Sequence, residues 1–362
     1  MSLPNGGHAE AARSDISDRS ENYMIKKKSI FSKDNILIFI LIIALIAGAF
    51  ASPTFLKLNN IKNILFSCCV YGILAVGQAC VMITKEIDLS IGAMIAFLPT
   101  LSIQIIDRLT KLAQGKSIIV GGNYVMTNWM LIVLLTMAGG ILMGMVTGLI
   151  VVKLKVPSLI VTLGTMTALS GLVYVLSGGY DLYLTNMEGV NWVGTKAAGN
   201  VIPVNFIIFL SIGIVMAVLM KYTKFGMRMY STGGKEKAAA ISGINTGRWK
   251  IIAFMISGLC AGIAAIIYCS RMETVGASQG SGYEMTAIAM AVVGGVTLEG
   301  GKGTIMGTVL STVLLTVVLN IQQLLGLVSW YQNLTIGIII VFAALLHNYK
   351  GKRFKTTLQT TT

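Results

Sequence analysis

Long apolar stretches separated by short polar ones run through the chain from about residue 36 to residue 346. Several stretches approach the roughly 20 residues with which an α-helix crosses a hydrocarbon layer about 30 Å thick. None shows the alternation of apolar and polar positions that is typical of a strand in an outer-membrane β-barrel. The pattern therefore predicts an all-α, polytopic membrane protein with about ten transmembrane or partly membrane-embedded helices.

Ten candidate helices follow from the apolar runs and the breaks between them. They are residues 36–52, 63–83, 88–106, 128–151, 158–177, 203–220, 250–270, 284–297, 304–322 and 330–346. The eighth run is too short to cross a membrane unaided. Whether the third and eighth runs cross fully or re-enter on the same side stays open at this stage.

The composition agrees with a membrane protein. Of the 362 residues, 55% are hydrophobic and 12% are charged, whereas a soluble domain carries about 25% charged residues. The five cysteines fall within apolar runs without the spacing of metal ligands, so we expect small core residues rather than a metal site or a disulfide framework. These cysteines are Cys68, Cys69, Cys80, Cys260 and Cys269. The two histidines, His8 and His347, lie in a tail and at the end of a span, and the sequence places no nucleophile together with a base. No catalytic residue is therefore predicted.

The formal net charge of +14 raises the question of a nucleic-acid partner. The basic residues lie between apolar runs and no soluble domain holds them in one patch, so we expect no nucleic-acid binding. If the N-terminus is cytoplasmic, 21 of the 28 basic residues fall in inside segments, which is the asymmetry of the positive-inside rule. Both termini are therefore expected in the cytoplasm, with lipid around the helices.

The ends of the chain differ from its apolar middle. Residues 1–35 are polar and lack a buried-core pattern, which predicts a disordered cytoplasmic tail. Residues 36–346 form the predicted membrane domain, and residues 347–362 form a basic cytoplasmic tail. Lys26–Lys28 precede an apolar run as in a signal peptide, but no A-x-A-like site clearly follows, so an uncleaved first helix is expected.

The segment FGMRMYSTGGKEKAAAISGINTGRWK, residues 225–250, predicts a short helix outside the membrane. The pair Gly233–Gly234 interrupts the preceding structure, and KEKAAAIS is a strong helix former with Glu236 in its first turn. Gly243 fits the end of this helix. The small side chains of Ala238–Ala240 would let another surface approach closely. The alternative is a solvated loop with an incidental helix.

The stretch MITKEIDLSIGAM, residues 82–94, places charges between two apolar runs. A charge near the bilayer centre costs at least a few kcal/mol. Asp88 and Ser90 can accept hydrogen bonds from exposed N–H groups at a helix start. The same order of apolar and polar residues recurs at Val296–Glu299, so each looks like a place where a helix stops and restarts. Such breaks can supply binding sites in transporters, and ordinary capped turns are the alternative.

Three segments resemble motifs of the inner-membrane permeases of monosaccharide ABC importers, the ribose-type family. They are the pattern Gly-Gly-x-x-x-x-Ala-Ala-x-Ser-Gly-Ile from Gly233, the run Ile87–Gly92, and AVVGGVTLEGGKGTIMGT at residues 291–308. The likeness extends from about Phe50 to Phe342 with the motifs in order. Two departures stand out: Glu86 occupies a usual glycine position, which puts the local turn in doubt, and Lys235 replaces a common asparagine.

The resemblance implies a fold like that of type II ABC importer permeases, in a bacterial cytoplasmic (inner) membrane. It also implies three kinds of partner: an ABC ATPase subunit, an extracytoplasmic sugar-binding protein and a second permease, identical or related. The residues implied in ATPase coupling are Gly233, Gly234, Glu236, Ala238, Ala239, Ser242, Gly243 and Ile244. The residues expected at the translocation path or a broken helix are Asp88, Ser90, Gly92, Thr162, Thr165, Gly294, Gly295 and Thr297. For Thr162 and Thr165, taken one at a time, close helix packing is favoured over a role in the path.

The sequence lacks the phosphate-binding pattern G-x-x-x-x-G-K-[ST] of an ATPase. Thr110 occupies the first glycine position before Gly115, and Gly303 follows Lys302 where Ser or Thr is required. We therefore expect no enzyme activity and no cofactor on this chain, with ATP and Mg²⁺ bound by a partner. A branched-chain amino-acid permease remains the main alternative. An ion-coupled transporter would carry paired charges deep in its spans, and the deep spans here hold almost none.

Overall fold

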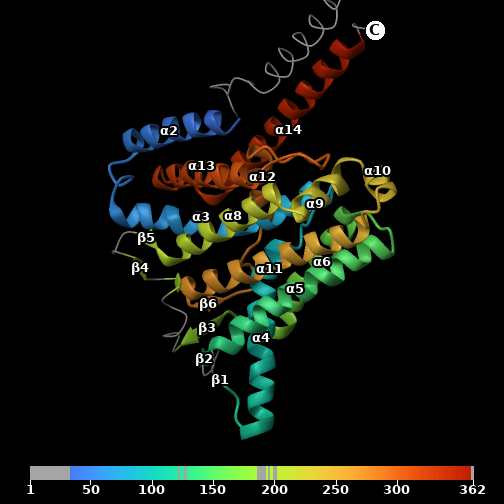
Figure 1. Ribbon diagram of the computed structural model, residues 1–362. Coiled ribbons are helices and arrows are strands. Elements are labelled where there is room, and N and C mark those ends of the chain that lie inside the picture. The colour runs from blue at the N-terminus through green and yellow to red at the C-terminus, as the bar shows by residue number, and fades with distance from the viewer. Residues whose placement is uncertain are drawn as a thin grey trace, which may run out of the picture.

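A computed structural model describes residues 33–120, 123–125, 129–185, 193–194, 196–198 and 202–359. Helices make up most of the described chain (Figure 1), which confirms the all-α class. Residues 1–32 of the predicted N-terminal tail lie outside the described part, and residues 33–35 already belong to the first described helix.

Each of the ten predicted runs overlaps with one helix, and the eighth run, 284–297, extends past the end of its helix at Val293. The helices are α2 (Lys33–Ala51), α3 (Leu58–Ile83), α4 (Ile91–Gln114), α5 (Trp129–Lys153), α6 (Ser158–Ser177), α8 (Val204–Tyr222), α11 (Thr246–Met272), α12 (Tyr283–Val293), α13 (Ile305–Leu324) and α14 (Ser329–Gln359). Within the described residues, seven of these helices are long and apolar enough to cross a membrane. With 11 residues, α12 confirms that the eighth run is too short. Residues 347–359 of the predicted C-terminal tail continue α14.

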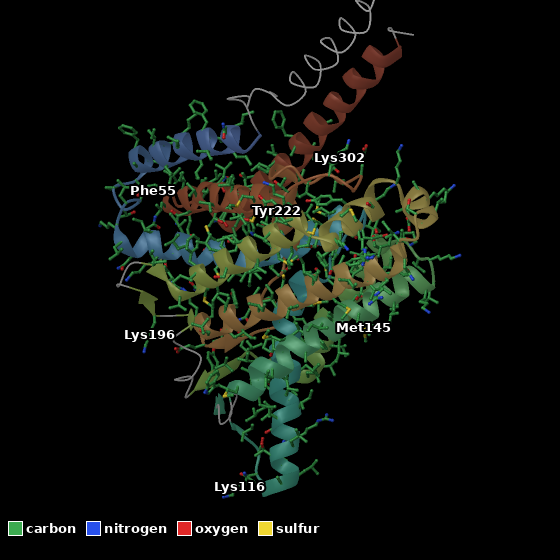
Figure 2. The ribbon with its side chains drawn as sticks, viewed as in Figure 1. Phe55, Lys116, Met145, Lys196, Tyr222 and Lys302 are labelled. Atoms are coloured by element: carbon green, nitrogen blue, oxygen red, sulfur yellow. The ribbon has the colours of Figure 1, made fainter. Side chains whose placement is uncertain are left out.

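The predicted bounds of the third run, 88–106, are wrong at both ends, because α4 begins at Ile91 and continues to Gln114. The Asp107 carboxylate holds the last turns: it pairs with Lys111 Nζ at 3.0 Å and accepts from Ile118 N–H at 2.8 Å. The predicted run ends at residue 106 because polar residues follow it in the sequence. Gly115, at φ +69°, then ends the helix. In the view of Figures 1 and 2, α4 runs across its neighbours and reaches out to the tip marked by Lys116.

The long connections contain short strands. They are β1 (Ile119–Val120), β2 (Asn123–Val125), β3 (Leu182–Thr185), β4 (Ala197–Ala198), β5 (Ile202–Pro203) and β6 (Thr274–Val275). In the order β1-β2-β3-β6, the pair β2–β3 is parallel and the other pairs are antiparallel. This sheet joins the connections that follow α4, α6 and α11. We call this end of the bundle the sheet end, and the opposite end, which carries α10 (Glu236–Ile241), the α10 end (Figure 1).

Helix α3 forms the centre of the bundle and contacts α8, α11, α12 and α13. Its residues from Cys68 to Ile83 are buried with the exception of Tyr71, which is half-buried. All five cysteines are buried as free thiols, so their prediction as small core residues is confirmed.

Helices α5 and α11 pack closely against each other, and glycines make that approach possible. A Cβ atom at Gly140 would overlap the Gly258 carbonyl oxygen, and one at Gly258 would overlap that of Gly140. One turn along, a Cβ at Gly144 would overlap the Phe254 carbonyl oxygen. Backbone-to-backbone contact of this kind is how small residues bring membrane helices together. The spacing Gly140-x-x-x-Gly144 places both glycines on one face.

We expect Gly140→Leu to force α5 and α11 apart and to lower the melting temperature of the purified protein by several degrees. Overpacking a well-packed interface costs about 1–3 kcal/mol. The matched control is Gly171→Leu in α6, where a Cβ meets nothing within 4 Å. Equal melting temperatures for the two variants would contradict the role of this contact.

Candidate functional site

Three segments that are distant in the sequence meet at the α10 end. Gly301 N–H donates to the Ile83 carbonyl oxygen at 2.8 Å, which joins the turn before α13 to the end of α3. A Cβ at Gly233 would overlap that same Ile83 oxygen, and one at Gly301 would overlap the Gly234 backbone. Gly301 also has a φ of +67°. Two of the three sequence motifs therefore touch through bare backbone, with no room for side chains.

The short helix predicted in the segment 225–250 is confirmed as α10, and it follows α9 (Lys224–Gly234). At its end, Gly243 N–H donates to Ala240 O and Ile244 N–H donates to Ala239 O, both at 3.0 Å. Gly243 has a φ of +80°. These bonds form a Schellman motif, so the predicted stop at Gly243 is confirmed.

A cluster of ion pairs, partly shielded from solvent, connects α10 to the rest of the site. Lys250 Nζ lies 2.9 Å from Glu86 Oε1 and 2.9 Å from Glu236 Oε1. The cluster joins the segment after α3, the first turn of α10 and the beginning of α11. Glu86, unusual for the resembled motif, thus has a partner. The left-handed residue of the turn is Lys85, at φ +70°, so the glycine position at 86 is not needed for the turn. Sequence reasoning missed Lys250, although an isolated Glu86 between apolar runs implied a cation.

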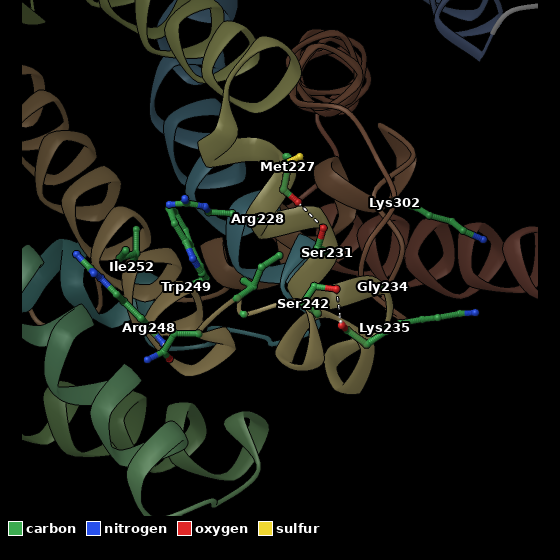
Figure 3. A pocket seen from close by; sticks show the side chains of 15 residues that line it. Met227, Arg228, Ser231, Gly234, Lys235, Ser242, Arg248, Trp249, Ile252 and Lys302 are labelled. Atoms are coloured by element: carbon green, nitrogen blue, oxygen red, sulfur yellow. Dashed lines mark hydrogen bonds between the residues drawn. The ribbon is translucent and has the colours of Figure 1, made fainter.

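A groove with a volume of about 1050 Å³ lies between α9, α10 and the start of α11. Figure 3 shows Arg228 from α9 and Trp249 from α11 on one side, with Lys235 and Lys302 on the other. The Arg228 guanidinium lies over the Trp249 ring, 5.6 Å from its centroid. The residues lining the groove include four cations and no carboxylate. Its charge is therefore suited to an acidic partner surface.

At the tip of α10, Ile241 exposes 88% of its surface. Ala238 and Ala240 are also exposed, whereas Ala239 is buried. Ile241 is thus a large apolar side chain exposed outside the hydrophobic spans and flanked by small ones.

Residues 84–90 turn back from the end of α3 into the bundle without forming a helix. Asp88 is fully buried there: its Oδ1 accepts from Ser90 Oγ at 2.6 Å, and its Oδ2 accepts from Ser257 Oγ at 2.8 Å. With its amide oriented so that both groups find partners, the Gln78 side chain donates to Asp88 O at 3.0 Å and accepts from Asp88 N–H at 3.3 Å. Both the carboxylate and the backbone of Asp88 are therefore satisfied.

Helix α6 holds the neighbouring residue. Ile87 N–H donates to Ser158 Oγ at 3.2 Å, and Thr162 Oγ1 donates to Ile87 O at 3.3 Å. Thr165 donates to Val161 O in its own helix at 2.9 Å. The expected capping by the Ser90 side chain is wrong, because that hydroxyl makes no cap bond and donates to Asp88 instead. Asp88 does accept the Ser90 N–H, at 3.0 Å.

The second predicted break lies between α12 and α13. Gly295 has a φ of +93°, and Thr297 Oγ1 donates to Gly300 O at 3.2 Å. A Cβ at Gly294 would overlap the first turn of α13, and one at Gly92 would overlap the Glu284 carboxylate. Both predicted breaks are thus confirmed as interruptions of helix. The described candidates form two groups: Asp88, Ser90, Gly92 and Thr162 between α6, α11 and α12, and Gly294, Gly295 and Thr297 against α13.

The arrangement supports transmission of movement rather than bond-making chemistry. Lys250 connects α10 to residues 84–90, and the Gly233–Gly234 backbone at the end of α9 contacts the turn before α13. Both breaks are therefore linked by contacts to the segment that carries α10. Among the described residues, no group of three His, Cys, Asp or Glu side chains is placed to hold a metal ion.

Comparison with known proteins places the chain among transport proteins. A profile of the family described as "Branched-chain amino acid transport system / permease component" matches residues 60–344. The chain is 32% identical over 327 residues to the ribose import permease protein RbsC of Escherichia coli K12, covering 90% of this chain and 96% of that protein. It is 35% identical over 315 residues to RbsC of Bacillus subtilis 168, covering 86% and 91%.

A third relative is named for a different sugar. The L-arabinose ABC transporter permease protein AraH of Azospirillum brasilense is 29% identical over 317 residues, covering 87% of each chain. No solved structure matches this chain.

We expect Ser257→Ala to destabilise the protein by about 1–3 kcal/mol, because it leaves one oxygen of the buried Asp88 carboxylate without a donor. Thermal unfolding of the purified protein in detergent measures the change. The control is Ser211→Ala, whose exposed hydroxyl donates to Ile207 O within α8. A Ser257→Ala protein as stable as this control would show that Asp88 does not depend on that bond.

Proposed function

The chain belongs to the family of permease components of branched-chain amino acid transport systems, and we propose that its own cargo is a monosaccharide of the ribose, galactose or xylose type. In this proposal it forms the membrane path of an ATP-driven ABC importer. The names of its relatives support sugar over amino acid, since the RbsC proteins are ribose permeases and AraH is an L-arabinose permease. The match covers nearly the full length of the E. coli RbsC protein.

One observation supports the proposal that a separate ATPase drives this chain: α10 is connected to both helix breaks. We propose that an ABC ATPase receives α10 in a groove of its own and moves it as ATP is bound and hydrolysed. Ile241 is the apolar anchor, and the cations Arg228, Lys235 and Lys302 meet acidic side chains of the partner.

Gly233, Gly234 and Gly243 allow the close approach, and Glu236 connects the movement to Lys250. No residue of this chain touches ATP in this scheme.

The basic residues support a cytoplasmic location of the α10 end and of both termini. The connection between α5 and α6 and the segment from α8 to α11 carry nine of the described cations, as the positive-inside rule expects for cytoplasmic loops. These are Lys153, Lys155, Lys221, Lys224, Arg228, Lys235, Lys237, Arg248 and Lys250. The sheet end then faces outward, where a sugar-binding protein delivers its cargo. A second permease, identical or related, completes the path.

An ion-coupled mechanism has little support in the described residues. Such transporters use unpaired or exchangeable charges deep in the membrane. The buried Asp88 carboxylate is instead fixed by two serine hydroxyls and one N–H group. Its bonds hold a backbone segment in place, so it is a structural carboxylate in this proposal.

Cells lacking the gene for this chain should lose uptake of at least one labelled monosaccharide from a panel of ribose, arabinose, galactose and xylose. The wild-type chain should restore that uptake, also in the presence of a protonophore when cellular ATP is maintained. Leucine uptake should not change. Dependence of leucine uptake on this chain, or loss of sugar uptake with the protonophore at constant ATP, would contradict the proposal.

We expect Ile241→Asp to reduce sugar uptake at least about tenfold, because loss of a buried anchor costs 2 kcal/mol or more at an interface. The protein should still reach the membrane and unfold at the wild-type temperature, since Ile241 contacts little of its own chain. Leu154→Asp is the matched control: Leu154 is 68% exposed at the same end, in the connection between α5 and α6. Wild-type uptake by Ile241→Asp would remove α10 from the coupling scheme.

A further inference from the structure

The sheet end of the four inner helices contains a second cavity, with a volume of about 270 Å³. We call it the tyrosine cavity. Its walls come from the beginning of α3, the end of α11, the beginning of α12 and the end of α13. The residues on which the argument rests are Asn63, Phe66, Tyr71, Tyr268, Arg271 and Tyr283. Sequence analysis assigned none of them to the path.

Aromatic rings form one side of the tyrosine cavity. The Tyr71 and Tyr283 rings meet edge to face with centroids 4.7 Å apart, and the Tyr268 and Tyr283 rings meet in the same way at 6.2 Å. Three tyrosines from three helices are therefore in contact at one point. Tyrosine combines an apolar ring with a hydroxyl group that donates and accepts, so it suits a ligand with both apolar and polar edges.

Polar groups also line the cavity. Arg271 Nη2 donates to Asn63 Oδ1 at 2.6 Å, and the guanidinium carbon lies 4.4 Å from the centroid of the Phe66 ring. This stacking and the bond to Asn63 fix the orientation of Arg271. Its remaining N–H groups, together with the Asn63 amide and the Ser67 hydroxyl, provide several donors and acceptors at fixed positions. No carboxylate is among the residues that line the cavity.

The cavity is closed toward the middle of the bundle. One turn deeper along α3, Ile73, Leu74, Ala75 and Val76 are fully buried, and so are Ala287 and Ala289 along α12. The contact between Tyr71 and Tyr283 therefore stands at the boundary between the cavity and the packed core. A ligand that entered from the sheet end would stop at these two rings.

We propose that the tyrosine cavity is a binding site for one neutral monosaccharide ring, at the end of the bundle opposite α10. The inference rests on the proposed function, and it adds the place where the cargo first meets this chain. The ring's apolar C–H face packs on Tyr71 and Tyr283, and its hydroxyl groups bond to Asn63, Arg271 and Ser67. A volume below the roughly 300 Å³ of the smallest drug-sized pockets fits a single ring rather than a disaccharide.

Protection of an introduced thiol tests the site directly. Met272 lines the cavity and is partly exposed, and all five natural cysteines are buried, so Met272→Cys supplies an accessible thiol on a low background. In the full-length chain in nanodiscs, a saturating monosaccharide should slow thiol modification at least about tenfold, since a ligand at ten times its Kd leaves roughly a tenth of sites free. Ribose 5-phosphate and leucine at equal concentration should not protect.

The control is Ser278→Cys, exposed at the same end but outside the cavity lining, whose modification rate should not respond to sugar. Uptake gives a second measurement: Tyr283→Ala should lower it at least about tenfold, whereas Tyr283→Phe, which keeps the ring, should retain most of it. Tyr180→Ala, an exposed tyrosine outside the cavity, should behave as wild type.

The outcomes separate the two proposals. If the wild-type chain imports a monosaccharide but that sugar leaves the Met272→Cys rate unchanged, the site is wrong and the proposed function stands. Protection by ribose 5-phosphate and not by the neutral sugar overturns the ligand class. If the wild-type chain imports no monosaccharide, the proposed function fails, and the site fails with it.

Discussion

Backbone groups inside a membrane protein must find partners within the protein, because the bilayer core supplies none. Residues 84–90 leave the helical state inside the bundle, and the rest of the site depends on how their polar groups are satisfied. Gln78 pairs with the Asp88 backbone, Ser158 and Thr162 hold Ile87, and the Asp88 carboxylate takes bonds from Ser90 and Ser257. Helices α3, α6 and α11 are thereby fixed around one extended segment, and α4 can begin within the bundle.

Residues 84–90 are also connected to α10 by ion pairs. Lys250 sits between Glu86 and Glu236, while the Gly233–Gly234 backbone lies against the end of α3 and the turn before α13. One contact is electrostatic and adjustable, and the other is steric and rigid. In the proposed coupling scheme, a displacement of α10 would reach the bundle in two ways: through a charge that can follow the displacement, and through the adjoining Gly233–Gly234 backbone, which has no free space beside it.

The sequence predicted much of this because hydrophobic runs, glycine pairs and helix formers act locally. All ten runs became helices, and Gly243 ends α10 as its conformational freedom implied. Prediction failed where the outcome depends on a side-chain partner that no local pattern specifies: Asp107 extends α4 by accepting the Ile118 N–H, the Ser90 hydroxyl donates to Asp88, and Lys250 pairs with Glu86, 164 positions before it. The tyrosine cavity could not be predicted from the sequence for the same reason, since its three tyrosines belong to three different helices and have no regular spacing along the chain.

The cluster around Lys250 also constrains how such a protein can change over evolution. A gain of Glu at position 86 introduces a carboxylate at a position that is nearly closed to solvent, and it is tolerable there because a cation faces it. If only the α10 segment were exchanged between two relatives, a carboxylate or an ammonium group of this cluster could be left without its partner. Chimeric permeases should therefore inherit positions 86, 236 and 250 as one unit.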